Sequence, residues 1–256
     1  MAKEIRSKRV EAVVLRHSDW GEADRLLVLY TREMGKVRAI AKGARKMRSR
    51  KAGHLQPFTR VTLQLAKGRD LWIVTQAEMQ DAFQPLRESL LRTAYGSYVV
   101  EIFDRFIYEE GEGQALYRLL VQTLARISKE EDAFLAVRYF EIRMLDLLGF
   151  RPNFLLCVGC GNEIKPEDQF FSALEGGIRC ANCGLVSASR PISVLALRHL
   201  RHLQRSNYQE VKRLPVPAHI REEIEALMHF YLTFLLERKL NSPAFLREVR
   251  GDYEKK

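Results

Sequence analysis

The sequence lacks the hydrophobic segments that would place it in or across a membrane. The longest uncharged stretch of its C-terminal helical region, 226–236, is far shorter than the roughly 18 residues of a membrane span. Residues 1–6 lack the apolar segment of a secretory signal. We therefore expect a cytoplasmic protein with no membrane partner.

Sequence motifs of several enzyme classes are also missing. There is no Gly-x-x-x-x-Gly-Lys-Ser/Thr phosphate loop, no Gly-x-Ser-x-Gly elbow and no His-Glu-x-x-His pair. The six histidines are scattered, and His199 and His202 share a helix face without an acidic residue to complete a metal site. The sequence predicts a protein that is not an enzyme, although acidic residues that cluster only in three dimensions leave a nuclease open.

Cysteine is scarce, and the four cysteines form two Cys-x-x-Cys pairs with nineteen residues between them. They are Cys157, Cys160, Cys180 and Cys183. Two thiolates three positions apart on a tight turn reach one tetrahedral ion at Zn–S distances of about 2.3 Å. Gly161 and Gly184 follow the pairs and allow a positive φ, so that backbone N–H groups can point at the sulfurs. The spacing predicts one zinc ion.

The segment between the pairs favours a zinc ribbon. Residues 169–174 and 178–180 flank Glu175-Gly176-Gly177, a pattern typical of a short hairpin that carries the second pair. Four thiolates close the coordination shell, so the zinc is expected to be structural rather than catalytic. Two disulfides or unpaired core thiols are the alternatives, and disulfides require an oxidising compartment.

Negative charge is scarce in the first third of the chain. Residues 1–80 hold 18 Lys and Arg against 8 Asp and Glu, whereas residues 81–256 hold 24 against 24. The whole net charge of +10 therefore belongs to the first 80 residues. Such an asymmetry indicates a polyanionic partner, with nucleic acid as the leading candidate.

The first 80 residues are rich in β-branched and aromatic residues and predict five strands. Their ranges are 8–16, 25–31, 36–41, 58–66 and 71–77, with 18–21 and 33–35 as turns. Five strands in about 75 residues are typical of a small closed barrel of the OB type. Residues 1–80 are expected to form this nucleic-acid-binding domain.

A basic segment separates the third and fourth predicted strands. No acidic residue occurs from Met34 to Arg69, a span with eleven Lys and Arg, and six of the ten residues in 42–51 are basic. A solvated loop without a partner is the alternative interpretation. The candidate DNA contacts are Lys36, Arg38, Lys42, Arg45, Lys46, Arg48, Arg50, Lys51 and Arg60.

Aromatic residues in or beside the predicted strands offer candidate stacking surfaces for bases. They are Trp20, Tyr30, Phe58 and Trp72. OB barrels commonly follow single strands with bases stacked on exposed aromatic side chains. For each residue alone, core packing is the more common role.

Residues 81–256 predict a mostly α-helical domain that the zinc segment, at about 154–188, interrupts. Helical spacing of apolar residues predicts helices over 87–108, 114–127, a third that ends at Gly149, 193–203 and 219–240. Residues 252–256 are expected to be disordered. The predicted fold class is α+β, with the five-stranded OB-type barrel at the N-terminus.

The whole chain resembles the RecO family of bacterial recombination mediators. The matching stretches are Gly21-Glu22-x-Asp24, Tyr30-Thr31-Arg-Glu-x-Gly35, Ala41-Lys42-Gly43-Ala-Arg45-Lys46 and Leu147-Leu-Gly149-Phe-x-Pro152, which leads into the cysteine pairs. The resemblance implies a nucleoid-associated repair protein that binds single- and double-stranded DNA and anneals complementary strands. It also implies action with RecR and the single-strand-binding protein, which lets RecA load onto coated DNA.

Two other functions remain compatible with the residues themselves. A zinc-ribbon transcription or RNA-binding factor would use the same basic barrel. An interaction adaptor would act through its helical region, with the basic loop contributing only solubility.

Overall fold

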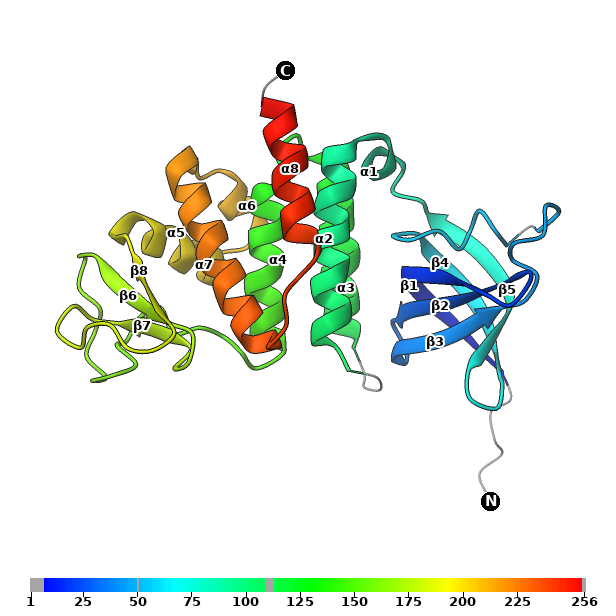
Figure 1. Cartoon of the computed structure of the whole chain (residues 1–256), viewed down its shortest axis with the longest axis horizontal. Helices are drawn as coiled ribbons and strands as arrows, with labels where there is room; N and C mark the ends of the chain where they lie inside the picture. Colours follow the sequence, from blue (N-terminus) through cyan, green and yellow to red (C-terminus); the bar gives the residue numbers. More distant parts are fainter. Residues whose placement is uncertain (1–6, 50, 109–112, 255–256) are drawn as a thin grey trace. The chain divides into compact units, whose positions relative to one another are not determined.

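The computed structural model describes residues 7–49, 51–108 and 113–254 of the chain (Figure 1). Its contacts divide into two compact units. Unit 1 joins Met1–Glu131 with Asn241–Lys256, and unit 2 is Asp132–Leu240. Compactness thus groups the barrel with the helices that follow it, and the expected domain boundary after residue 80 stays a prediction.

Unit 1 contains the closed five-stranded barrel that the sequence predicts. The strands are β1 (Ser7–Trp20), β2 (Asp24–Thr31), β3 (Gly35–Ala41), β4 (Arg60–Lys67) and β5 (Trp72–Asp81). They pair in the order β1-β2-β3-β5-β4, and β1 closes on β4. The contact between β3 and β5 is parallel, whereas the other pairs are antiparallel. This OB-type barrel leaves no free sheet edge.

Apolar and polar residues alternate along β3 and β4, which explains why the barrel interior is apolar. Val37, Ala39 and Ala41 point inward from β3, and Leu63 and Leu65 do so from β4. Two residues per repeat place these side chains on one face of each strand, while the intervening polar residues face outward. The core is therefore apolar, and Arg38 lies exposed on the outer wall.

The first predicted turn is wrong by three residues. Residues 18–20 continue β1, because Trp20 pairs with Asp24 across the hairpin. The turn is Gly21–Ala23, and Gly21 has φ of +56°. The Ser-Asp dipeptide is typical of turns, but the pairing with β2 extends the strand.

The helices of unit 1 are α1 (Gln84–Glu88), α2 (Leu90–Phe106), α3 (Gln114–Lys129) and α8 (Ser242–Glu254). The single helix expected over 87–108 begins late, since Ser89 breaks the run. Its hydroxyl accepts a hydrogen bond from the Arg92 N–H and starts α2. A serine at this position is a preferred N-cap, so the break has a local cause.

Unit 2 combines helices with the cysteine segment. The helices are α4 (Phe134–Leu147), α5 (Val194–Arg205), α6 (Tyr208–Lys212) and α7 (Ala218–Leu236). The strands β6 (Gln169–Ser172), β7 (Gly177–Arg179) and β8 (Ser189–Ile192) form one sheet in the order β7-β6-β8. The expected hairpin is β6–β7, and β8 is an additional strand. Phe171 of β6 packs edge-on against Tyr231 of α7, which fixes the sheet to the helices.

The C-terminal expectations are wrong in two places. The helix expected over 219–240 ends at Leu236, because Glu237 takes the left-handed conformation with φ of 52°. The region expected to be disordered is helical as far as Glu254, as part of α8, while 255–256 lie outside the described residues. Across the residues with assigned structure, no helix is both long enough and apolar enough for a membrane span.

Candidate metal site and nucleic-acid surface

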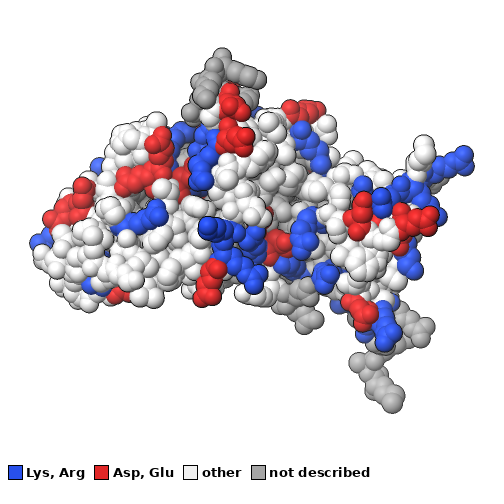
Figure 2. Space-filling view, viewed as in Figure 1, with Lys and Arg blue, Asp and Glu red and all other residues white. Residues whose placement is uncertain are grey.

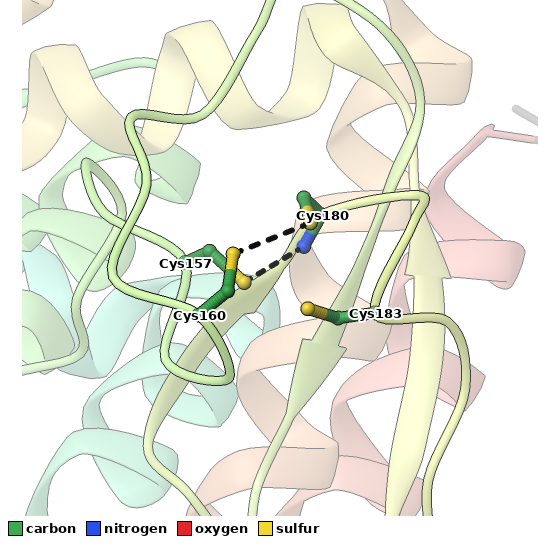
Figure 3. Close-up of side chains that lie close together, drawn as sticks. All are labelled: Cys157, Cys160, Cys180 and Cys183. Carbon is green, nitrogen blue, oxygen red and sulfur yellow. Dashed lines mark hydrogen bonds between the residues drawn. The ribbon is translucent and has the colours of Figure 1, made fainter.

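The two Cys-x-x-Cys pairs meet in unit 2 (Figure 3). One ligand atom from each cysteine lies within 4.8 Å of the others. The Sγ atoms of Cys160 and Cys180 are 3.8 Å apart. A tetrahedral zinc ion with Zn–S bonds of about 2.3 Å requires S–S distances of about 3.8 Å. The donor set and its spacing therefore fit a metal ion, and all four thiols are free of disulfide bonds.

Backbone donors favour the thiolate of Cys157. Its Sγ accepts a hydrogen bond of 3.2 Å from the Cys180 N–H. Burial opposes ionisation, but the N–H groups of Cys180, Cys160 and Gly159 outweigh it and lower the pKa of Cys157 to about 6. Hydrogen bonds among the crowded sulfurs raise the pKa of Cys183 to about 12. Four thiolates repel one another, so a dication is the natural counter-charge.

Local residues hold both cysteine turns in place. Gly161 and Gly184 have φ of +77° and +63°, the conformation predicted for them. Arg179 forms two hydrogen bonds with the Glu175 carboxylate and donates to the carbonyls of Cys183 and Gly184. These contacts come from β7 and its turn, so they position the second pair of cysteines.

The basic segment after β3 is folded against one end of the barrel. The Asp24 carboxylate accepts a hydrogen bond of 2.7 Å from the Gly43 N–H. The Arg45 guanidinium lies 3.1 Å from Asp19 and donates to the carbonyls of Gly21 and Glu22. Two acidic residues beside the β1–β2 turn therefore anchor the start of the segment.

The anchored segment presents basic side chains at this end of the barrel. Lys42 and Lys46 line an open pocket of about 570 Å³ with Glu22 and Asp24. Arg48 is exposed next along the chain, and Lys51 donates to the Val74 carbonyl. Figure 2 shows Lys and Arg side chains gathered at this part of the barrel, with acidic side chains beside them. Among the residues that the structure describes, no ion pair involves Arg38, Lys42, Lys46, Arg48 or Lys51.

Three of the nine candidate DNA contacts are paired with carboxylates, namely Arg45, described above, Lys36 and Arg60. The Lys36 ammonium lies 2.8 Å from the Asp104 carboxylate of α2 and donates to the carbonyls of Asp104 and Ile107. Arg60 lies 3.3 Å from the Glu11 carboxylate. Both cations are half-buried. Arg50 lies outside the described residues.

The four candidate stacking aromatics differ in exposure. Tyr30 and Phe58 are buried, with 1% and 8% of their surface exposed. Tyr30 packs edge-on against Phe103 of α2, and burial raises its pKa to about 12. Trp72 packs partly against the barrel core, whereas Trp20 is 48% exposed at the end of β1. The structure thus leaves Trp20 as an accessible ring beside the basic segment.

Sequence reasoning missed the acidic residues that organise this surface. Asp24 and Asp19 precede the acid-free span, and Asp104 lies in a helix about seventy residues from Lys36. Asp24 belongs to the stretch Gly21-Glu22-x-Asp24 of the family resemblance, and the sequence alone does not show that its carboxylate holds the Gly43 N–H. No local signal in the sequence marks Asp104 as the partner of a barrel lysine.

Comparisons with known proteins cover both parts of the chain. The family model described as Recombination protein O N terminal matches residues 5–83, and Recombination protein O C terminal matches residues 87–244. A "DNA repair protein RecO" of Roseiflexus sp. (strain RS-1) is 39% identical, over 94% of this chain and 86% of the relative. Proteins of the same name from Pelotomaculum thermopropionicum (38%; 93% of each chain) and Moorella thermoacetica (36%; 95% of this chain, 92% of the relative) are also similar.

Proposed function

From the premise that the chain belongs to the RecO family of DNA repair proteins, we propose that it binds DNA through the basic end of its barrel and acts as a recombination mediator. The observation that supports this most is the set of cations without carboxylate partners beside an exposed Trp20. They are Arg38, Lys42, Lys46, Arg48 and Lys51. Lys36 and Arg60 are left out of the proposed interface, because their charges are already compensated.

The physical basis of binding is the release of counterions from phosphate groups. If these side chains neutralise about five phosphates of a single strand, log K falls against log[salt] with a slope near −3.5. A fourfold rise in salt then weakens binding by about two decades. Arg45 contributes indirectly, since its contacts with Asp19 and the β1–β2 turn position Lys42 and Lys46.

Strand annealing follows from the same charge compensation. Cations that shield two DNA strands lower their mutual repulsion, and base pairing then selects the complementary product. The process requires no nucleotide hydrolysis, which agrees with the lack of a phosphate loop in the sequence. The family supports RecR and the single-strand-binding protein as partners, with RecA loading as the indirect outcome.

The four cysteines are proposed to hold one structural zinc ion. Cys157, Cys160, Cys180 and Cys183 supply four sulfur donors, and this set leaves no position for a reacting water. The ion would join the two turns around β6–β7 and stabilise that part of unit 2. It has no role in the proposed DNA contact, which lies in unit 1.

The test of the barrel surface is a triple charge reversal. Lys42→Glu, Lys46→Glu and Arg48→Glu should lower affinity for labelled oligo(dT) about a hundredfold near 0.1 M salt, and reduce the salt slope by about 2. Fluorescence anisotropy across a salt series measures both quantities. Annealing of complementary strands should fall with affinity.

The matched control reverses three exposed cations on helices of unit 1, at Arg118, Lys129 and Arg247. It changes net charge equally and should bind oligo(dT) within about twofold of the wild type. Equal binding by the barrel variant and the wild type would refute the proposed surface. A preference for one duplex sequence or for structured RNA would favour a transcription or RNA-binding factor instead, and cutting that depends on magnesium would reveal a nuclease.

A further inference from the structure

A basic pocket lies in unit 2 and shares no residue with the proposed barrel surface. It is open, has a volume of about 610 Å³, and is formed by residues of α5 and of the segment before α7. Leu195, Leu214 and Pro215 give it an apolar wall. This volume is ample for one nucleotide, and apolar walls with a few charged groups are usual for ligand sites.

The polar wall of this pocket is entirely cationic or neutral. Arg198, Arg201 and Arg205 project from one side of α5, at spacings of three and four residues, together with His199 and His202. Residues at these spacings are neighbours on a helix surface. No Asp or Glu is among the described residues that line the pocket.

The charges of the three arginines are not balanced within the pocket. Arg198 and Arg205 are exposed, and neither forms an ion pair among the described residues. Arg201 is fixed in place by a 2.7 Å hydrogen bond from its Nε to the Phe154 carbonyl. Burial and the neighbouring charge of Arg205 lower the pKa of Arg201, while Glu163 raises it. Like charges four residues apart destabilise a helix, and a bound anion would remove that repulsion.

A ring nitrogen in the same wall also lacks a partner. His202 contacts the Ser206 hydroxyl through Nδ1, at 3.1 Å, but its buried Nε2 has no hydrogen-bond partner among the described residues. His199, by contrast, has the Leu195 and Pro215 carbonyls within hydrogen-bonding distance.

We propose that this pocket binds a backbone phosphate of a nucleic-acid strand, held by Arg198, Arg201 and Arg205, with the adjoining sugar and base against Leu195, Leu214 and Pro215. Guanidinium groups match phosphate oxygens in geometry, and a planar base suits an apolar wall. The site consists of residues of unit 2, is additional to the barrel surface described above, and as a strand contact rests on the proposed function. A free phosphate anion has the same charge chemistry and is distinguished by experiment.

Arginine footprinting of the full-length protein tests the site directly. Phenylglyoxal modifies accessible arginines, and mass spectrometry reports the extent at each position. Oligo(dT) should protect Arg198 and Arg205 at least threefold, while the exposed helix arginines Arg118 and Arg247 serve as unprotected references. Protection by millimolar inorganic pyrophosphate but not by oligo(dT) would assign the pocket to a small anion and overturn the strand contact. No protection by either would overturn the site.

Charge reversal gives an independent measure. Arg198→Glu with Arg205→Glu should weaken oligo(dT) binding about three- to tenfold and reduce the salt slope by about 0.7–1.4. The double variant Arg118→Glu with Arg247→Glu is the control of equal charge. If the glutamate variant does not fold, Arg198→Gln with Arg205→Gln should give a smaller loss in the same direction. Unchanged affinity in a folded pocket variant overturns the proposal whatever the result for the barrel variant, so the two surfaces are judged separately.

Discussion

Trp20 is the residue whose position gives the barrel surface an accessible aromatic ring. It ends β1, pairs with Asp24, and is about half exposed beside the anchored basic segment. Base stacking on such a ring contributes about 1–3 kcal/mol per base. Trp20→Ala should therefore weaken oligo(dT) binding by about 5- to 160-fold in anisotropy titrations.

The control variant replaces Trp20 with another aromatic residue that can still stack on a base. Trp20→Phe should retain most of the affinity, because phenylalanine preserves a π-face. The salt slope should be unchanged in both variants, since neither removes a charge. Equal affinity of the alanine variant and the wild type would contradict a stacking role.

Asp104 joins the barrel to α2 through two cations. Its carboxylate pairs with Lys36 of β3 and with Arg16 of β1, both at 2.8 Å. Burial opposes the charged form, yet the contacts with Lys36 and Arg16 hold the pKa of Asp104 below its ordinary value. Asp104→Asn should lower the free energy of unfolding by about 1–3 kcal/mol at pH 7.

The sign of the pH dependence follows from the lowered pKa of Asp104. The stabilisation is fully present above the unfolded pKa of about 3.9 and is lost as pH falls through the lower folded value. The difference between wild type and Asp104→Asn should therefore shrink below about pH 4. Urea unfolding at pH 7, 5 and 3.5 measures it, and a difference independent of pH would contradict the assignment.

At the residue scale, the sequence shows which side chains are charged, but it does not show which of them are exposed or paired. The acid-free span identifies the basic segment, since charge is visible in residue identity, and its contact with DNA stays a prediction. It did not reveal that Lys36 is compensated, because Asp104 reaches it only through the packing of α2 on the barrel. Likewise, Tyr30 and Trp20 are equally aromatic in sequence, and only the packing against Phe103 buries the first.

At the scale of elements, the cysteine sheet depends on the two turns that carry its sulfurs. Short strands such as β7, with three residues, gain little stability from pairing alone. Structural zinc binds isolated knuckle peptides with apparent free energies of about 10–16 kcal/mol. Cys160→Ser should therefore prevent binding of the proposed zinc ion and lower the unfolding free energy of unit 2, while the oligo(dT) affinity of the barrel stays within about twofold.

Metal analysis by mass spectrometry and thermal melting followed by circular dichroism check the zinc prediction. Asn162→Ser is the control, because it alters an exposed neighbour that supplies no sulfur. A full complement of zinc in Cys160→Ser would contradict four-sulfur coordination. A protein without metal that melts like the wild type would contradict the structural role.

The sequence predicted the elements whose apolar residues recur with a clear helical or strand periodicity. It did not predict the elements whose ends depend on tertiary contacts. All five barrel strands and the β6–β7 hairpin have local apolar patterns. α8 was missed, since it starts where the Glu101 carboxylate of α2 accepts hydrogen bonds from Asn241 and Ser242. Glu101 thus satisfies the first N–H groups of a helix 140 residues away in sequence, which no local pattern indicates.

At the scale of the whole molecule, charge is distributed unequally along the chain. The net charge of +10 belongs to the first 80 residues, yet the further basic pocket lies within residues 81–256, where 24 Lys and Arg balance 24 Asp and Glu. Net charge therefore indicated the barrel, but the grouping of arginines on one side of α5 required the fold. A count of charges by region averages over such local clusters.

The placement of both tryptophans in the barrel has a practical consequence for spectroscopy. The chain has two, Trp20 and Trp72, and unit 2 has none. Tryptophan fluorescence will consequently report unfolding of the barrel and will change little when unit 2 unfolds. Loss of far-ultraviolet ellipticity that precedes any change in emission would mean that helices unfold before the barrel does.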